Sequence, residues 1–170
     1  VASCRRPNLT LIVHLVKGKA ERVPRILELV SEMGAAGRGI IFVSARKATA
    51  ELAKKLAAKG VPAAHFHGGM KQRERSDAIS AWQVGTKSVM VATVAFGMGI
   101  DQPDVRLVVH LTPPSSLERY EQEVGRAGRD GGHAKCVCFY SEPGLRKLVR
   151  DAKSAEEKTS ANEVVAFLHD

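Results

Sequence analysis

The feature that most constrains the fold is a series of short apolar runs that recurs along the chain. Residues 39–43, 88–92 and 105–111 are the clearest of these runs. A run without polar alternation is typical of a strand that is buried on both faces of a parallel sheet. The segments between the runs place apolar residues at helical spacing, as residues 23–33 do. Strands that alternate with helices predict a three-layer α/β/α domain with a mostly parallel sheet.

The same pattern gives the order of the elements. The expected strands are residues 8–16, 39–43, 61–66, 88–92, 105–111 and 133–140. A helix should follow each strand except residues 88–92, which lead into a loop. We expect residues 1–150 to form one domain. The charged residues 151–159 are interpreted as an exposed linker, and residues 151–170 would then end in a helix that leads to a domain outside this chain.

Charge and composition narrow the classes of partner. The net charge is +8 and the isoelectric point is about 9.7. This balance favours a polyanionic partner, most commonly nucleic acid, although a merely soluble basic protein has the same balance. An aromatic content of 5% argues against a base-stacking surface. The apolar runs are strand-length, so we expect no membrane-spanning segment.

The cysteines indicate the compartment. Cys4 is far in sequence from Cys136 and Cys138, so the three do not suggest a disulfide framework. A reducing, intracellular setting fits best, which would be the nucleus in a eukaryote and the nucleoid or cytoplasm otherwise. The thiols at 136 and 138 have no further ligands nearby, so we expect no bound metal.

Several polar residues stand just past the expected strand ends, where ligands bind in open α/β sheets. They are Ser44, His67, Thr93 and Asp101. Ser44, with Arg46 at the following helix start, suits either a phosphate contact or a plain N-cap. His67 opens a turn followed by basic residues, and it could bind a nucleic-acid backbone or join two loops.

The segment from residue 89 to residue 101 holds several residues that could bind a ligand. A buried strand delivers Thr93 into a loop with Gly97 and Gly99, followed by the carboxylate of Asp101. A glycine-rich loop leaves backbone N–H groups free to meet phosphate. Asp101 could accept from a ribose hydroxyl or orient an arginine. The alternative is a capping threonine and an ordinary turn aspartate.

The densest segment is residues 120–132, Tyr-Glu-Gln-Glu-Val-Gly-Arg-Ala-Gly-Arg-Asp-Gly-Gly. Arg126 and Arg129 are three positions apart behind Gln122, so on a helix they would address one anion. This is the arrangement of an arginine finger, which neutralises charge on a transferred phosphoryl group. The alternative is a solvated basic helix end with a glycine cap.

Two further motifs are missing from the sequence. It has no G-x-x-x-x-G-K-[ST] phosphate loop and no paired-acid motif for holding Mg²⁺. An arginine finger without its own phosphate cradle acts on a nucleotide bound elsewhere. The chain is therefore interpreted as half of an ATPase.

Residues 92–101, 104–106 and 120–131 resemble the second RecA-like motor domain of the RecQ family of DNA helicases, within superfamily 2. The likeness extends from Arg6 to about Tyr140. Its most selective string is Ala-Phe-Gly-Met-Gly-Ile-Asp at residues 95–101. DEAD-box RNA helicases usually carry histidine and arginine where this chain has Gln122 and Glu123. Residues 66–70 depart mildly from the Tyr-His-Ala-Gly-Leu that is frequent in the family.

The resemblance implies that ATP and Mg²⁺ bind in a cleft between two RecA-like domains of one polypeptide. The first domain, absent here, would supply the phosphate loop and the metal-binding acids. Arg129 would be the arginine finger, Arg126 a second phosphate contact, and Gln122 a tie to the γ-phosphate region. Gly99 and Asp101 would face the nucleotide.

The resemblance also implies a track for DNA. Ser44 and Thr93 would touch the DNA backbone, and we place Arg46 and His67 beside them. The whole enzyme would move 3′→5′ along single-stranded DNA and unwind duplex DNA, while this chain alone would be inactive. Two other functions remain open, namely a non-catalytic nucleic-acid-binding RecA-like module and part of an RNA helicase.

Overall fold

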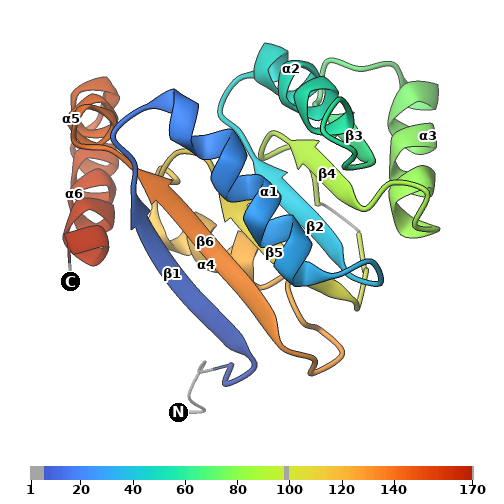
Figure 1. The fold of residues 1–170 in the computed structure, drawn as a ribbon. Coiled ribbons are helices and arrows are strands. Elements are labelled where there is room, and N and C mark those ends of the chain that lie inside the picture. Colours follow the sequence, from blue (N-terminus) through green and yellow to red (C-terminus); the bar gives the residue numbers. More distant parts are fainter. Residues whose placement is uncertain (1–5, 98–99, 170) are drawn as a thin grey trace.

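A computed structural model describes residues 6–97 and 100–169 of the chain. Its centre is a six-stranded sheet in the order β1-β6-β5-β2-β4-β3 (Figure 1). The strands are β1 (Leu9–Leu15), β2 (Arg38–Phe42), β3 (Ala63–Phe66), β4 (Val89–Ala92), β5 (Val105–His110) and β6 (Ala134–Tyr140). Each pair of neighbouring strands is parallel. The expected α/β class is confirmed, and the sheet is parallel throughout.

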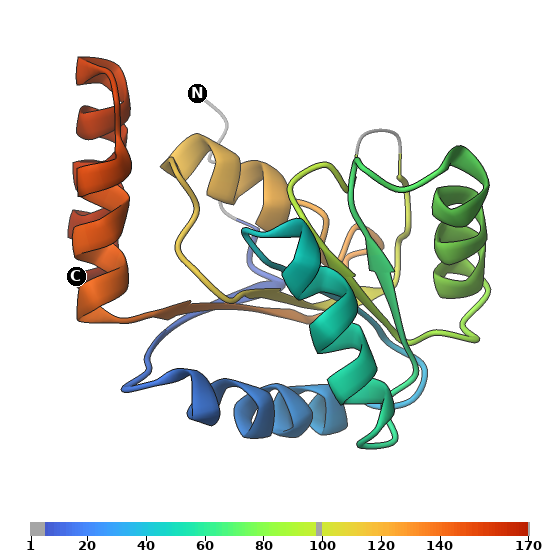
Figure 2. The same cartoon turned by 90° about the horizontal axis from the view of Figure 1, so that it is seen from above.

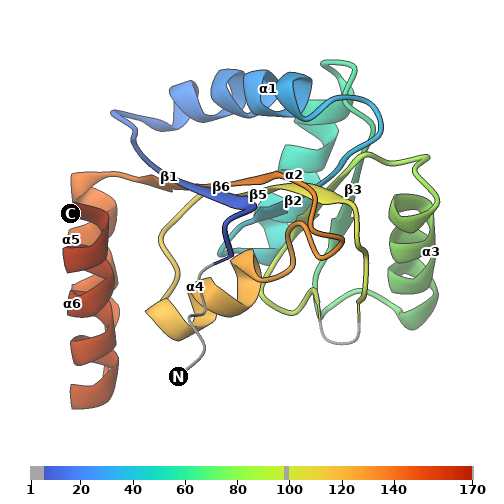
Figure 3. The ribbon, with the colours of Figure 1, turned by 90° about the horizontal axis from the view of Figure 1, so that it is seen from below.

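Helices cover both faces of the sheet. The helices are α1 (Arg22–Met33), α2 (Arg46–Ala57), α3 (Gln72–Gln83), α4 (Leu117–Val124), α5 (Glu142–Asp151) and α6 (Ala155–His169), with a short 3₁₀ turn η1 (Lys19–Glu21) before α1. α1 and α2 pack on one face, and α4 lies on the other, as Figures 2 and 3 show from opposite sides. α3, α5 and α6 also pack into the core on the α4 side.

The pleat of the strands divides the core in two. Ile40 and Phe42 of β2 point into the cluster beneath α4, whereas Ile41 and the following Val43 point into the cluster beneath α1 and α2. Successive side chains of a strand face opposite sides, so a continuous apolar run fills both clusters. This is why the strands in the middle of the sheet have no polar alternation.

The expected linker at residues 151–159 is wrong in its extent. α5 ends at Asp151 and α6 begins at Ala155, so residues 155–159 are helical. Ser154 Oγ accepts from the Glu157 amide at 3.1 Å, and Glu157 Oε2 accepts from the Ser154 amide at 3.4 Å. This reciprocal pair is a capping box, which starts a helix within a charged sequence. The prediction that this end of the chain leads to another domain stays untested.

Candidate functional site

Three of the predicted site residues follow neighbouring strands. Ser44 follows β2, Thr93 follows β4 and His67 follows β3, and the sheet order places these strands side by side. The Thr93 amide donates to the Phe66 carbonyl at 3.2 Å, which ties two of the strand ends together. Ser44 is exposed, while only 8% of the Thr93 surface is accessible. The structure thus gathers these residues at one edge of the sheet.

Arg46 lies over the turn that follows β3. A Cβ atom built on Gly69 would lie 3.1 Å from Nη1 of Arg46, so the guanidinium closely approaches this turn. His67 shapes the turn itself, since its Nδ1 accepts from the Gly69 amide at 3.2 Å. Ser44 is not the N-cap of α2, because Ala45 holds that position without a side-chain cap. Arg46 and His67 therefore flank the strand-end edge together.

Arg126 projects from the end of α4 onto the loop after β4. Its Nη1 donates to the Gly97 carbonyl oxygen at 2.5 Å. Burial and the neighbouring charge of Arg129 lower the pKa of the Arg126 guanidinium from its ordinary value. Nε of Arg126 is buried without a hydrogen-bond partner among the described residues. Arg126 is thus a partly desolvated cation that supports the glycine loop.

Arg129 reaches the same loop three residues further on. Its Nη1 donates to Asp101 Oδ1 at 2.7 Å and to the Ile100 carbonyl at 3.2 Å. The Arg129 side chain stays 37% exposed and the Asp101 side chain 85% exposed, so an anion that competes with Asp101 can reach the guanidinium. Of the two roles expected for Asp101, the structure shows the contact with an arginine.

The two remaining predicted site residues are Gln122 and Gly99. Gln122 is exposed on α4, one turn before Arg126. Gly99 lies outside the described residues.

The described part of the chain holds no cluster of three or more His, Cys, Asp or Glu side chains arranged as metal ligands. Within the same ranges, none of the helices combines the length and apolar character that a membrane span needs.

A buried polar pair was missed by sequence reasoning. His110 at the end of β5 and Glu123 on α4 are 2% and 5% exposed, and His110 Nε2 lies 2.7 Å from Glu123 Oε2. His110 also stacks on Phe42, with ring centroids 5.2 Å apart. The available signal was the position of Glu123 beside the apolar Val124, on the side of α4 that is buried. The pair fastens α4 to the sheet, and Arg126 and Arg129 follow this helix in a turn and not on the helix, where the sequence pattern had placed them.

Sequence reasoning also missed an ion pair at the end of the arginine segment, residues 120–132, which carries Arg126 and Arg129. The guanidinium of Arg106 on β5 binds both carboxylate oxygens of Asp130, with 2.9 Å between Nη1 and Oδ1. Asp130 Oδ1 accepts as well from the Gly132 amide at 2.9 Å. The Arg106 hydrogen bond, and then the Gly132 amide, lower the pKa of Asp130 to about 2. The ion pair between Arg106 and Asp130 therefore closes the loop that follows Arg129.

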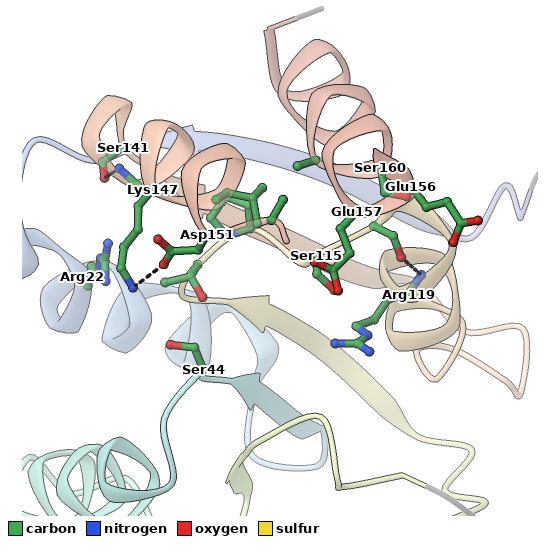
Figure 4. A pocket seen from close by; sticks show the side chains of 17 residues that line it. Arg22, Ser44, Ser115, Arg119, Ser141, Lys147, Asp151, Glu156, Glu157 and Ser160 are labelled. Carbon is green, nitrogen blue, oxygen red and sulfur yellow. Dashed lines mark hydrogen bonds and ion pairs between the residues drawn. The ribbon is translucent and has the colours of Figure 1, made fainter. Parts of the chain in front are cut away.

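The carboxyl edge of the sheet continues into a groove of about 640 Å³. Ser44 lies on one side of it, and α5 and α6 contribute Lys147, Asp151 and Ser160 from the other (Figure 4). Lys147 Nζ pairs with Asp151 Oδ2 at 3.2 Å. The groove carries both signs of charge and lies away from Arg126 and Arg129, which line a different and much smaller pocket.

Together, the parallel sheet, the glycine loop that follows β4 and the two arginines bonded to that loop define a RecA-like α/β domain. The chain belongs to the helicase conserved C-terminal domain family, whose model matches residues 18–131. That match includes the loop after β4 and the arginine segment through Gly131.

Named relatives are DNA helicases of the RecQ type. The chain is 41% identical over 141 residues to ATP-dependent DNA helicase hus2/rqh1 of Schizosaccharomyces pombe, covering 82% of this chain and 10% of that protein. It is 44% identical over 110 residues to ATP-dependent helicase SGS1 of Saccharomyces cerevisiae, covering 65% and 8%. The resemblance to the RecQ family is confirmed, and the chain spans only a small part of these relatives.

A solved structure supports the fold. The Escherichia coli DEAD-box protein SrmB, crystallised with the regulator of ribonuclease activity A, superposes with a TM-score of 0.71 at 27% identity. The superposition covers 85% of each chain. This DEAD-box protein therefore shares the arrangement of strands and helices.

Proposed function

We propose that this chain is the second motor domain of a RecQ-like, ATP-dependent 3′→5′ DNA helicase. The observation that carries the proposal is the contact of Arg126 and Arg129 with one loop, through Gly97 and Asp101 respectively. Two guanidinium groups are thereby held on the loop that leaves the carboxyl end of β4, on the α4 side of the sheet. The similarity to DNA helicases supports the substrate class.

In this proposal Arg129 exchanges one anion for another. Arg129 is held by Asp101 through a largely exposed ion pair that contributes little to stability. A γ-phosphate presented by a first RecA-like domain would compete with this carboxylate for the guanidinium. Arg126 would stay on Gly97 and add positive charge, while the exposed Gln122 would tie α4 to the γ-phosphate region. ATP and Mg²⁺ would be bound mainly by the first domain.

The DNA path would follow the strand ends beside the nucleotide. The Ser44 hydroxyl is exposed, and the Arg46 guanidinium stands over the turn of His67. Thr93 begins the loop that continues to Asp101. A shift of that loop would therefore move a residue placed beside the DNA together with a residue placed beside the nucleotide. Contacts of this kind read phosphates and not bases, so we expect little sequence preference. Work on chromosomal DNA would place the protein in the nucleus of a eukaryote.

The test is Arg129→Ala in the full-length protein. ATP should bind with nearly unchanged affinity, while the hydrolysis rate falls by roughly 10³-fold or more, as for loss of an arginine finger. Arg150→Ala removes an exposed charge from α5 and serves as the matched control. A wild-type hydrolysis rate in Arg129→Ala would remove the assignment. Steady ATP turnover by the isolated 170-residue chain would also contradict the proposal.

An RNA helicase is the second candidate, since the solved DEAD-box structure shares the fold. The two candidates differ in which nucleic acid stimulates ATP hydrolysis. We expect single-stranded DNA to stimulate the full-length protein more strongly than RNA of the same length. The opposite order would favour the second candidate.

A further inference from the structure

The peptide groups that precede the two arginines accept hydrogen bonds from side chains about 120 residues earlier in the sequence. Arg6, before β1, donates from Nη1 to the Gly125 carbonyl at 3.1 Å and from Nη2 to the Gly128 carbonyl at 2.6 Å. Asn8 Nδ2 donates to the carbonyls of Gly128 at 2.8 Å and Gly132 at 2.9 Å. These contacts span about 120 residues of sequence, so only the folded domain can make them.

The accepting carbonyls have a particular place in the covalent chain. The Gly125 carbonyl belongs to the peptide group that ends at the nitrogen of Arg126, and the Gly128 carbonyl to the one that ends at the nitrogen of Arg129. A peptide group is planar, so holding its oxygen also fixes the orientation of the next backbone nitrogen. One planar guanidinium on both oxygens therefore sets how the two arginine backbones are spaced and turned.

Gly128 fits this contact because it lacks a side chain. Its φ is +55°, and a Cβ built on it would lie 2.5 Å from both Asn8 Nδ2 and the Gly132 carbonyl oxygen. Its own amide donates to the Val105 carbonyl at 2.8 Å. The turn between the arginines is thus fixed to β5 on one side and to the segment before β1 on the other.

We propose that Arg6 and Asn8 are positioning residues for Arg126 and Arg129, and that they set the rate of hydrolysis without contacting the nucleotide. The inference rests on the proposed function, because it assumes that the two arginines act on ATP. A misplacement of a catalytic group by about 1 Å costs on the order of 10²-fold in rate. Loosening this grip should therefore lower kcat and leave ATP affinity in place.

The experiment compares Arg6→Lys and Asn8→Ala in the full-length protein. Lysine keeps the charge of Arg6 but cannot bridge two carbonyls in a fixed fork. We expect kcat for ATP to fall roughly 10- to 100-fold in each variant, with KM changed less than about twofold. Asn162→Ala, at an exposed position of α6, and Arg150→Lys, at an exposed position of α5, are the matched controls and should behave as wild type.

Amide hydrogen exchange on this chain reports the grip itself. Faster exchange confined to residues 125–132, together with the loss of kcat, supports the inference. A wild-type kcat in Arg6→Lys overturns the inference. If Asn8→Ala lowers the stability of the whole domain, Arg6→Lys alone decides the test. If Arg129→Ala keeps its hydrolysis rate, the proposed function fails instead, and exchange still shows whether Arg6 and Asn8 hold the segment.

Discussion

The guanidinium of Arg126 occupies the space that a side chain at residue 97 would need. A Cβ built on Gly97 would lie 2.1 Å from Cζ of Arg126, and the φ of Gly97 is +122°. The Gly97 carbonyl also accepts the hydrogen bond from Arg126 Nη1. The glycine after β4 is therefore shaped to receive the arginine that follows α4.

Gly97→Ala should displace Arg126 and slow ATP hydrolysis in the full-length protein by more than tenfold. The methyl group collides with the guanidinium, and the backbone strain adds about 1–3 kcal/mol of instability. Gly60→Ala is the matched control, because Gly60 has a similar positive φ of +84° with no atom within 4 Å of the added methyl group. Both variants should lose stability in thermal unfolding. Equal hydrolysis rates in the two variants would contradict the prediction.

Glu123→Ala should destabilise the domain by about 3 kcal/mol or more, since it leaves His110 buried without its partner. Glu123→Gln keeps a hydrogen-bonding group of the same size and should cost less than half as much. Urea unfolding of this chain measures both variants. Glu121→Ala, an exposed change on the same helix, should stay within about 0.5 kcal/mol of wild type. If Glu123→Ala were as stable as that control, the buried pair would not stabilise the fold.

Asp130 should contribute to acid stability over a defined range of pH. Its pKa falls from 3.8 to about 2 on folding, because Arg106 and the Gly132 amide bind the charged carboxylate. The folded state therefore keeps the charge where the unfolded chain already takes up a proton. The resulting stabilisation is complete above about pH 4 and is lost as the pH falls toward about 2.

Asp130→Asn removes this titration. The difference in unfolding free energy between wild type and Asp130→Asn should be constant near neutral pH and shrink between about pH 4 and pH 2. Asp77→Asn, which removes an exposed carboxylate from α3, is the control. A difference that does not change across the acid range would rule out the Arg106 contact as its source.

Arg46→Ala should weaken the binding of single-stranded DNA to the same extent for every sequence tested. Loss of one phosphate contact reduces the slope of log K against log salt by about 0.7. Fluorescence anisotropy at several salt concentrations measures the slope. Lys59→Ala, in the turn after the end of α2 that lies opposite Arg46, should leave the slope unchanged. An unchanged slope in Arg46→Ala would place the DNA elsewhere.

The sequence was sufficient for the strands, because continuous apolar runs such as residues 39–43 have few other uses in a globular domain. It also placed Ser44, His67 and Thr93 at strand ends. It did not show that β2, β4 and β3 are neighbours, since strand order depends on contacts between distant segments. The structure supplied that order and so brought the three residues together.

Other features lay outside what local patterns report. The bonds from Arg6 and Asn8 to the arginine segment join residues about 120 positions apart, and their polar side chains give no periodic signal. The charged stretch after Asp151 was judged by its composition, which obscured the helix start at Ser154 and Glu157. Capping is a matter of two or three positions, whereas composition averages over many.

The pairing of β1 with β6 has a consequence for how the protein is made. β1 has β6 as its neighbour in the sheet, and Asn8 is 124 residues away from its partner Gly132. At about 5–20 residues per second, the ribosome needs roughly 6–25 s to supply that partner. β1 must therefore wait unpaired until β6, the last strand of this sheet, emerges, and the turn that carries Arg126 and Arg129 takes its shape only after residue 132 has been made.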